Sequence, residues 1–165
     1  MIARATLLLA AALSLSACNE NTALGNDRAA QLQPAPTPAP VEPVEAALAN
    51  VSPAIIKPET MSLADLEALG GRAGRCAMTL TEVAYPSFLF QTGAAGVIKL
   101  NGKLIPLPEV REGLYQAGGL TVSISLLDEE GNAGSQGMQM IVVPPGAEDE
   151  LGYHGYVQCY EGVEV

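Results

Sequence analysis

The segment Val97–Leu107 reads Val-Ile-Lys-Leu-Asn-Gly-Lys-Leu-Ile-Pro-Leu and carries the clearest fold signal in the sequence. Its centre, Asn101-Gly102, is the residue pair that a type I′ turn favours, because both central residues of that turn adopt positive φ angles. Apolar residues alternate on both sides of the turn, as they do in strands with one buried face. The segment therefore predicts a β-hairpin. The expected cross-strand pairs are Leu100 with Lys103 and Ile98 with Ile105, and the shared apolar face carries Ile98, Leu100, Ile105 and Leu107.

The same alternation recurs along the chain after Arg75. Apolar runs are separated by about 8–12 residues that include Gly, Asp or Pro, a spacing typical of small antiparallel barrels and sandwiches. Pro106 cannot donate a ladder hydrogen bond, so its strand is expected at an edge or beside a bulge. We therefore expect an all-β domain, a small antiparallel barrel or sandwich of about seven to eight strands. The strand-like runs are Cys76–Thr81, Ser87–Gln91, Val97–Leu100, Lys103–Leu107, Leu120–Leu126, Met138–Val143 and Leu151–Tyr160.

A short helix is expected immediately before the strands. Ser62 and Asp65 have the spacing of a capping box, and the segment Leu63–Leu69 places its leucines on one face. Gly70-Gly71 then ends the helix. We expect this helix to pack on the strands or to cover them, and the folded domain to span residues 60–165.

A proline-rich segment precedes the helix. From Pro34 to Pro40 every second residue is Pro, which favours extended polyproline II and prevents a helix. We expect residues 18–59 to form a disordered linker, within which Val44–Val51 could form two helical turns. The alternative is a docking motif for a proline-binding partner. Seven of the 12 prolines lie here: Pro34, Pro36, Pro38, Pro40, Pro43, Pro53 and Pro58.

The N-terminus has the composition of an export signal. Arg4 provides a positive charge, and the apolar run Ala5–Leu13 is shorter than the ~20 residues that a bilayer-spanning helix needs. The sequence Leu15-Ser16-Ala17-Cys18 follows and matches the lipobox of bacterial lipoprotein precursors at every position. The alternatives for this region are an ordinary secretory signal peptide and a buried helix.

On these residues the chain resembles a bacterial lipoprotein precursor. The resemblance implies that residues 1–17 are a signal peptide and that the thiol of Cys18 receives a diacylglycerol. Two or three acyl chains anchor a protein firmly, at ~0.8 kcal/mol for each buried CH₂ group. Asn19 stands where the inner-membrane retention signal of the family has Asp. The expected location is therefore the outer membrane of the bacterial envelope, on the side that faces the periplasm.

Two cysteines remain besides Cys18. Cys76 and Cys159 lie in the first and last predicted strands, and an even pair in an exported protein is expected to form a disulfide. Closing a loop of some 80 residues stabilises a fold by about 4 kcal/mol in the chain-entropy account. The alternative is a reactive or metal-binding pair of thiols, for which the sequence has neither C-x-x-C spacing nor histidine partners.

The net negative charge of the chain disfavours anionic partners and favours basic ones. The chain has 8 Lys and Arg against 18 Asp and Glu, a net charge of −10, which disfavours nucleic acid and anionic membrane surfaces. No Lys or Arg follows Arg111, so the C-terminal third is expected to attract a basic partner. The acidic residues after Arg111 are Glu112, Asp128, Glu129, Glu130, Glu148, Asp149, Glu150, Glu161 and Glu164.

No pattern in the sequence is typical of a catalytic site. His154 is the single histidine, which excludes histidine-rich metal sites. The segment Gly134–Gly137 lacks the order of the G-x-S-x-G nucleophile elbow and is expected to be a hairpin loop. The acidic runs 128–132 and 148–150 could bind calcium but lack the residue order of a calcium-binding loop. We expect no enzyme activity, no cofactor and no metal.

The last predicted strand offers a candidate binding surface. If Cys159 faces inward, the alternation of a strand turns every second side chain before it outward. Tyr and His on one exposed strand face suit recognition of a partner. The alternative is that the chain terminus or the helix covers them. The four residues of this candidate surface are His154, Tyr156, Gln158 and Tyr160.

Over roughly 85 residues the domain also resembles the lipid-anchored or periplasmic inhibitors of c-type lysozyme. Those inhibitors are small antiparallel barrels with a Cys near each end, and the order of Cys76, the Asn101-Gly102 hairpin, Gly113–Tyr115 and Cys159 is similar. The inhibitory loop of that family resembles Ser-Gly-x-x-Tyr and is followed by a basic residue. Here Glu112 precedes Gly113–Tyr115 and acidic residues follow, so the resemblance implies the fold and not the inhibitory residues.

Together these features predict a lipid-anchored lipoprotein of the cell envelope whose β-domain is a non-enzymatic binding module. Its expected contacts are the membrane, through the lipid on Cys18, and a basic envelope protein or hydrolase. Nucleic acid is not expected as a partner. The alternative function is inhibition of lysozyme-like hydrolases.

Overall fold

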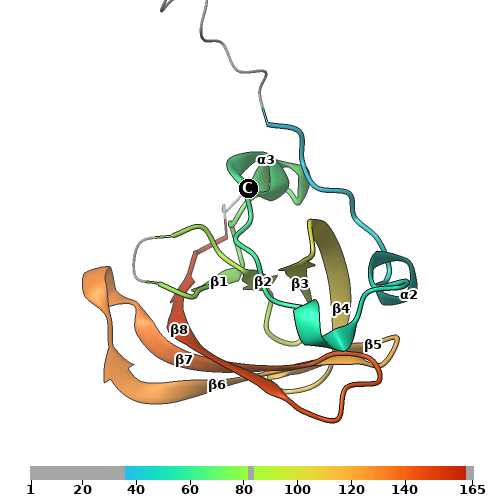
Figure 1. Ribbon diagram of the computed structural model, residues 1–165. Helices are drawn as coiled ribbons and strands as arrows, with labels where there is room; N and C mark the ends of the chain where they lie inside the picture. The colour runs from blue at the N-terminus through green and yellow to red at the C-terminus, as the bar shows by residue number, and fades with distance from the viewer. Residues whose placement is uncertain (1–35, 82–83, 163–165) are drawn as a thin grey trace, which may run out of the picture. The chain divides into compact units, whose positions relative to one another are not determined.

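Eight antiparallel strands form a closed barrel in the computed structural model, which describes residues 36–81 and 84–162 (Figure 1). Strands that are neighbours in sequence are neighbours in the sheet, and β1 pairs with β8 to close it. The prediction of an all-β fold is confirmed, and of the two architectures left open the chain adopts the barrel. The strands are β1 (Cys76–Thr79), β2 (Phe88–Phe90), β3 (Ala95–Leu100), β4 (Lys103–Arg111), β5 (Leu114–Ala117), β6 (Leu120–Glu130), β7 (Gln136–Val143) and β8 (Leu151–Cys159).

The hairpin of β3 and β4 forms as the sequence predicts. Asn101 and Gly102 have φ angles of 47° and 72°, which the type I′ turn requires. Leu100 pairs with Lys103 and Ile98 with Ile105. The four side chains of the predicted apolar face, Ile98, Leu100, Ile105 and Leu107, are fully buried inside the barrel.

The second strand of that hairpin differs from the expectation in one respect. Because β4 pairs with both β3 and β5, it is not an edge strand. Its register shifts between Glu109 and Arg111, so the bulge that Pro106 suggested lies a few residues further along. The pairing with β5 includes only Glu109 and Arg111, and earlier in the strand Val41 forms a parallel bridge with Leu104.

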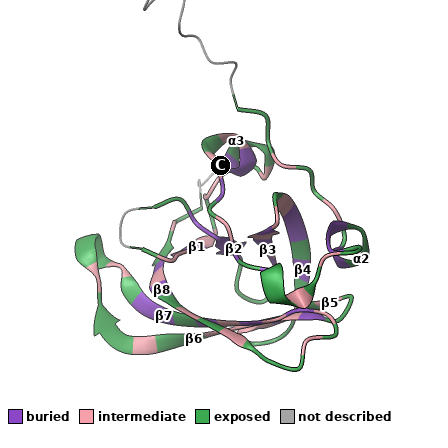
Figure 2. Ribbon diagram, viewed as in Figure 1, coloured by how far each residue is buried: buried purple, intermediate pink, exposed green. Residues whose placement is uncertain are grey.

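The barrel interior is filled by alternate side chains of every strand. Figure 2 marks the buried residues along the strands in purple. The aromatic rings of Phe88, Phe90 and Tyr115 pack together, with centroids 5.0–6.0 Å apart. Gly96 lies inside the barrel at this point, and a Cβ atom there would lie 2.4 Å from the Phe88 ring. The glycine is needed because the ring occupies the space of its missing side chain.

The segment before the strands closes one end of the barrel. It contains helix α2 (Val44–Ala47) and the 3₁₀ helix η1 (Pro53–Ile55). A Cβ atom at Gly118, in the turn from β5 to β6, would lie 2.8 Å from the Cβ of Val44, so α2 packs against that turn. The side chains that enter the barrel core from this segment are Val44, Ala47, Leu48 and Ile56.

The prediction that residues 18–59 are a linker is therefore wrong for the described residues from about 41 onward. Pro40 and Glu42 exchange backbone hydrogen bonds with Leu104 on β4, and Glu59 donates to Lys99 on β3. The folded domain thus starts well before Thr60. Helix α2 forms within Val44–Val51, the segment for which two helical turns were one expectation. The predictions for residues 1–17, Cys18 and most of the linker before Pro36 lie outside the described residues.

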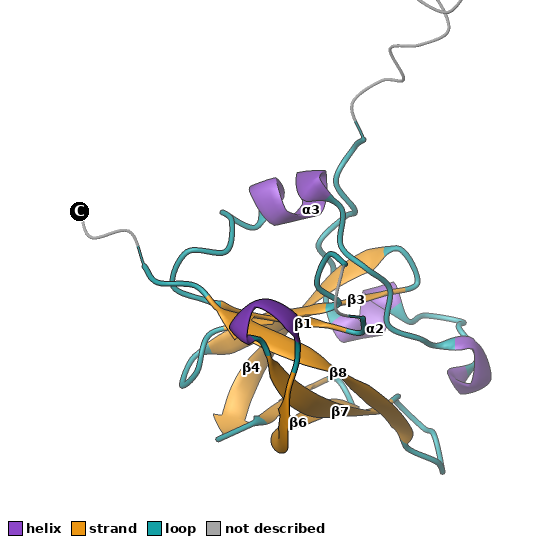
Figure 3. Cartoon of the chain, turned by 90° about the vertical axis from the view of Figure 1, so that its left-hand side faces the viewer, coloured by secondary structure: helices purple, strands orange, loops and turns teal. Residues whose placement is uncertain are grey.

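Helix α3 (Leu63–Ala68) lies outside the barrel (Figure 3) and packs on outward-facing side chains of β1, β2 and β4. The predicted capping box forms, since Ser62 Oγ accepts from Asp65 N–H and the Asp65 carboxylate accepts from Ser62 N–H. Asp65 is fully buried and also binds Ala39 N–H and Lys99 Nζ, at 2.6 and 2.7 Å. A second apolar cluster lies under the helix: Met61, Leu66, Ala77, Leu89 and Leu104.

Four polar contacts fix the ionisation of Asp65. Burial raises its pKa, but the hydrogen bonds from Lys99, from the N–H groups of Ser62 and Ala39, and with the Ser62 hydroxyl outweigh that effect. The net result lowers its pKa from 3.8 to about 2. The carboxylate therefore stays charged and joins helix α3, the preceding segment and strand β3.

Candidate functional site

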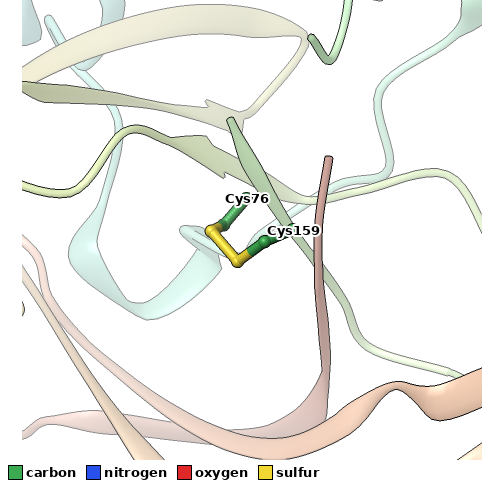
Figure 4. The surroundings of a disulfide bond; sticks show 2 residues. All are labelled: Cys76 and Cys159. Carbon is green, nitrogen blue, oxygen red and sulfur yellow. A yellow bond between two sulfur atoms is a disulfide. The ribbon is translucent and has the colours of Figure 1, made fainter. Parts of the chain in front are cut away.

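The Cys76–Cys159 disulfide joins β1 to β8 (Figure 4). It lies at the end of the barrel that α2 does not close. The two residues are directly paired across the seam that closes the barrel, 83 positions apart in sequence. The predicted bond is confirmed. Cys159 is exposed, and both cysteines line the opening at this end.

A cavity of about 630 Å³ opens at this same end. Its volume lies within the range of small-molecule pockets, roughly 300–1,000 Å³. Inward-facing apolar side chains form its walls, and polar groups surround its mouth. The main apolar residues are Phe90, Tyr115, Ile124, Leu126, Met138 and Val157.

Glu109 holds the rim of the cavity together. Its carboxylate accepts hydrogen bonds from Gly113 N–H, at 2.8 Å, and from Gly93 N–H in the loop between β2 and β3. It also accepts from the hydroxyl of Tyr115 in the cavity wall. One side chain therefore fixes two rim loops and one wall residue.

Tyr115 is neutral and fully buried. Burial raises the pKa of its phenol above the usual range, and the negative charge of Glu109 and the hydrogen bond to it act in the same direction. In the resemblance to lysozyme inhibitors, this tyrosine follows Gly113 in the loop segment. Because Tyr115 points into the barrel, it is not free to enter the cleft of an enzyme.

The charged residues that line the cavity are acidic, and Arg111 lines an adjoining hollow together with Glu109 and Glu112. Glu109 and the exposed Glu112 line the cavity itself, and no Lys or Arg does so among residues 36–81 and 84–162. Gly134 and Gln136 line both this cavity and an adjoining hollow at the tip of the β6–β7 hairpin. That hollow is formed by the acidic run Asp128–Glu130, so the negative surface continues from the mouth onto the hairpin.

The candidate surface on β8 divides into two parts. Val157 is buried, and His154 and Gln158 are exposed, as the alternation predicts. His154 Nε2 lies 2.6 Å from Glu129 Oε1, and its ring is 5.9 Å from that of the half-buried Tyr156. These two residues therefore form a group with the β6–β7 hairpin.

Tyr160 belongs to the other part, beneath the loop that follows α3. Its hydroxyl accepts from Arg72 at 3.0 Å and donates to Gln158, and its ring packs at the edge of the second apolar cluster. Arg72 also lies 5.8 Å from the ring centroid of Tyr85. Tyr160 is half-buried, as Tyr156 is, and it contacts Arg72 of this loop and Gln158, so the four residues do not form one continuous group; their role in binding stays a prediction.

The described residues contain no group of three or more His, Cys, Asp or Glu side chains placed to hold a metal ion. Ser135 lies in the loop between β6 and β7, where a hairpin loop was expected, and its hydroxyl bonds to the Asn132 carbonyl. In the part of the chain that the structure describes, no helix is long and apolar enough to span a bilayer. The site is thus defined by shape and charge.

A family model described as "Domain of unknown function (DUF6692)" matches residues 14–162, most of the chain. The chain belongs to this family. Neither the curated proteins nor the solved structures include a significant match. The family match covers the sequence Leu15–Cys18 together with the whole barrel.

Sequence reasoning missed the main residues of the cavity. Glu109 and Tyr115 are brought together by the pairing of β4 with β5, and β5 was not among the predicted strands. Its four residues are too few for a periodic pattern, although the glycines Gly113 and Gly118-Gly119 on either side were a usable signal. Phe90 was assigned to a strand but not to a site.

Proposed function

We propose that this protein is a lipid-anchored lipoprotein of the bacterial envelope and that its barrel is a non-enzymatic binding module. The open end of the barrel is its binding site. The observation that carries the proposal is the cavity of about 630 Å³ at one end, while α2 and its flanking residues close the other. Mouths of small barrels are frequent ligand sites.

The partner that fits this site is a basic protein that presents a positive charge on an apolar base. Apolar side chains form the walls and Glu112 lies exposed at the mouth, with the acidic hairpin tip Asp128–Glu130 beside it. Negative potential at a cleft raises the rate at which a cationic partner associates. A Lys or Arg side chain on a projecting loop of a basic envelope protein or hydrolase has the required chemistry.

The lipid anchor is proposed from the lipobox. Cys18 is the attachment residue, and the signal peptide 1–17 is removed on this proposal. The Cys76–Cys159 disulfide supports export to an oxidising compartment. The expected location remains the outer membrane, facing the periplasm. Cys18→Ser is expected to abolish incorporation of labelled palmitate and membrane fractionation, and a variant that still incorporates label would contradict the anchor.

The binding site is tested with two charge reversals that change net charge equally. Glu112→Lys alters the open end, whereas Glu148→Lys alters the exposed loop between β7 and β8. The probe is a capped peptide, Phe-Gly-Lys-Gly-Phe, titrated by NMR into the Cys18→Ser chain. We expect Glu112→Lys to weaken binding several-fold and Glu148→Lys to leave it nearly unchanged. Equal effects of the two variants would refute a site at the open end.

The alternative function is inhibition of lysozyme-like hydrolases, and the negative charge of the open end is the observation that favours it. A turbidity assay of bacterial cell lysis by a c-type lysozyme, with and without the Cys18→Ser chain, separates the two functions. Stoichiometric protection would establish an inhibitor. Peptide binding without protection would support the general binding module.

A further inference from the structure

One side of strand β6 has no neighbouring strand at the open end of the barrel. β5 pairs with β6 only as far as Ser123, although β6 continues beside β7 to Glu130 (Figure 1). The last backbone contact on this side is the hydrogen bond from Ile124 N–H to the Gly113 carbonyl. In the part of the chain that the structure describes, no strand pairs with this side of β6 beyond that bond. We name the segment Leu126–Glu130 the free edge.

Leu126 directs its backbone hydrogen-bonding groups toward the free edge. The N–H group of Ile124 points to β5, and the direction of these groups alternates along a strand. The N–H and C=O groups of Leu126 therefore point away from β7, whereas those of Ser125 point toward it. Unpaired donors and acceptors along a strand are a template for one more strand. An extended polypeptide is the class of partner that has the complementary groups.

The cavity lies directly beside the free edge. Ile124 and Leu126 form part of its wall, and Glu112 and Gly113 line it where β5 begins. Paired strands lie about 4.8 Å apart, so a strand added beside Leu126 would run along the mouth of the cavity. Every second side chain of that strand would enter the apolar interior. Backbone pairing and a pocket for alternate side chains thus occur together, as they do in strand addition.

The charge of the free edge selects its occupant. Asp128, Glu129 and Glu130 are exposed there, and Glu129 is paired with His154. No Lys or Arg of residues 36–81 and 84–162 forms an ion pair with Asp128 or Glu130. A second copy of the chain, paired antiparallel around Asp128, would place carboxylates opposite one another, which is destabilising. A segment that carries Lys or Arg is attracted instead.

We infer that the partner proposed for the open end binds by adding a strand to β6. An extended basic segment pairs with Leu126 and places alternate apolar side chains in the cavity, while its cations lie near Asp128 and Glu130. The added strand rests on the proposed function and specifies the backbone conformation of the partner. A cation on a folded loop needs side-chain contacts alone, whereas an added strand also needs the backbone N–H groups along one of its two edges.

The requirement for one edge is tested with N-methylated peptides. The probe is a capped heptapeptide, Lys-Val-Thr-Val-Thr-Val-Lys, titrated by NMR into the ¹⁵N-labelled Cys18→Ser chain. One derivative carries methyl groups on the three Val nitrogens, and the other carries them on the two Thr nitrogens and the last Lys nitrogen. The two derivatives have the same side chains and charge but block opposite edges. We expect their affinities to differ at least about tenfold, since one loses its backbone hydrogen bonds to β6.

The weaker derivative also reports the direction of the added strand. Residues directly opposite each other in an antiparallel pair share a face, so the residues that bond to Leu126 are then those facing the cavity. With the valines in the cavity, methylated valines block antiparallel addition and methylated threonines block parallel addition. In either direction the unmodified peptide is expected to slow hydrogen exchange of the Leu126 amide at least about tenfold. Exchange at Glu148, in the loop between β7 and β8, is the control.

Two variants of one residue test the edge from the side of the protein. Leu126→Pro and Leu126→Ala both remove the leucine side chain, but only the proline removes the backbone N–H. Proline is tolerated where the N–H of a strand faces solvent, so we expect the two melting temperatures to agree. The unmodified peptide is expected to bind the proline variant at least about fivefold more weakly than the alanine variant.

Three results would overturn the added strand. The first is equal affinity of the two methylated peptides, and the second is an absence of saturable binding by the unmodified peptide. The third is a dimer in sedimentation equilibrium that Leu126→Pro dissociates, because a second copy of the chain would then be the occupant. The proposed function fails on a different comparison, that of Glu112→Lys with Glu148→Lys. A site at the open end that binds both methylated peptides equally would keep the proposed function and exclude the strand.

Discussion

The two ends of the barrel differ in what fills them. At one end α2 and its flanking residues insert Val44, Ala47 and Leu48 between the strands, and these side chains are nearly inaccessible to solvent. At the other end no segment among residues 36–81 and 84–162 covers the strands, and Leu126 is 59% exposed at the mouth of the cavity. The difference indicates that one end stabilises the fold while the other is available to a partner.

The largest expected change in stability comes from a charge placed at the closed end, compared with the same charge at the open end. Val44→Asp buries a carboxylate without a partner, and we expect it to lower the free energy of unfolding by more than about 4 kcal/mol. Leu126→Asp, on an exposed side chain, is expected to cost less than about 0.5 kcal/mol. Urea denaturation measures both. Similar losses for the two variants would contradict the contrast between the ends.

Removal of the disulfide at the open end is expected to cause the next largest loss of stability. Cys159→Ala removes a bond that closes a long loop, and we expect a loss of about 3 kcal/mol and a melting temperature lower by several degrees. Scanning calorimetry of the oxidised chain and the variant provides the comparison, with the reduced wild-type chain as a control. If reduction left the melting temperature unchanged, the seam between β1 and β8 would not depend on the bond.

A smaller effect on stability is expected at Asp65, which lies under helix α3 and not at either end of the barrel. Its pKa is 3.8 when unperturbed and about 2 in the folded chain, so its charge stabilises the fold fully above pH 4. As pH falls through 4 toward 2, about 2 kcal/mol of stability is lost. Asp65→Asn is expected to be less stable at pH 7 and to lack this part of the acid dependence. Parallel acid profiles for the two chains, followed by circular dichroism, would show that Asp65 is not responsible.

The contrast between the ends also explains what the sequence could predict. The β3–β4 hairpin depends on a local turn, Asn101-Gly102, and on alternation around it, so its register is readable. The closed end depends on Val44 and Leu48, which lie among prolines typical of a linker and become core only through contact with distant strands. The local sequence around Val44 and Leu48 therefore does not predict their contact with the strands.

In the candidate site, too, local features were predictable from the sequence and long-range contacts were not. The outward direction of His154 and the inward direction of Val157 were predictable from alternation along one strand. The hydrogen bond from Arg72 to Tyr160 joins residues 88 positions apart, so it was not predictable from that strand. The cavity required closure of the barrel, which joins Cys76 to Cys159. The contact of Glu109 with the loop at Gly93 instead continues the β3–β4 pairing by one residue. Such sites arise from long-range pairing and not from a motif.

The most direct test of the open end as the binding site is photo-cross-linking in cells from one exposed apolar position at each end. Leu126 at the open end and Ile55 at the closed end are 59% and 64% exposed, so a photoreactive residue at either is equally accessible. Each is introduced into the full chain, and adducts are detected by immunoblotting. We expect a discrete adduct with a basic protein from position 126 and none from position 55. An adduct from position 55 alone would contradict the account.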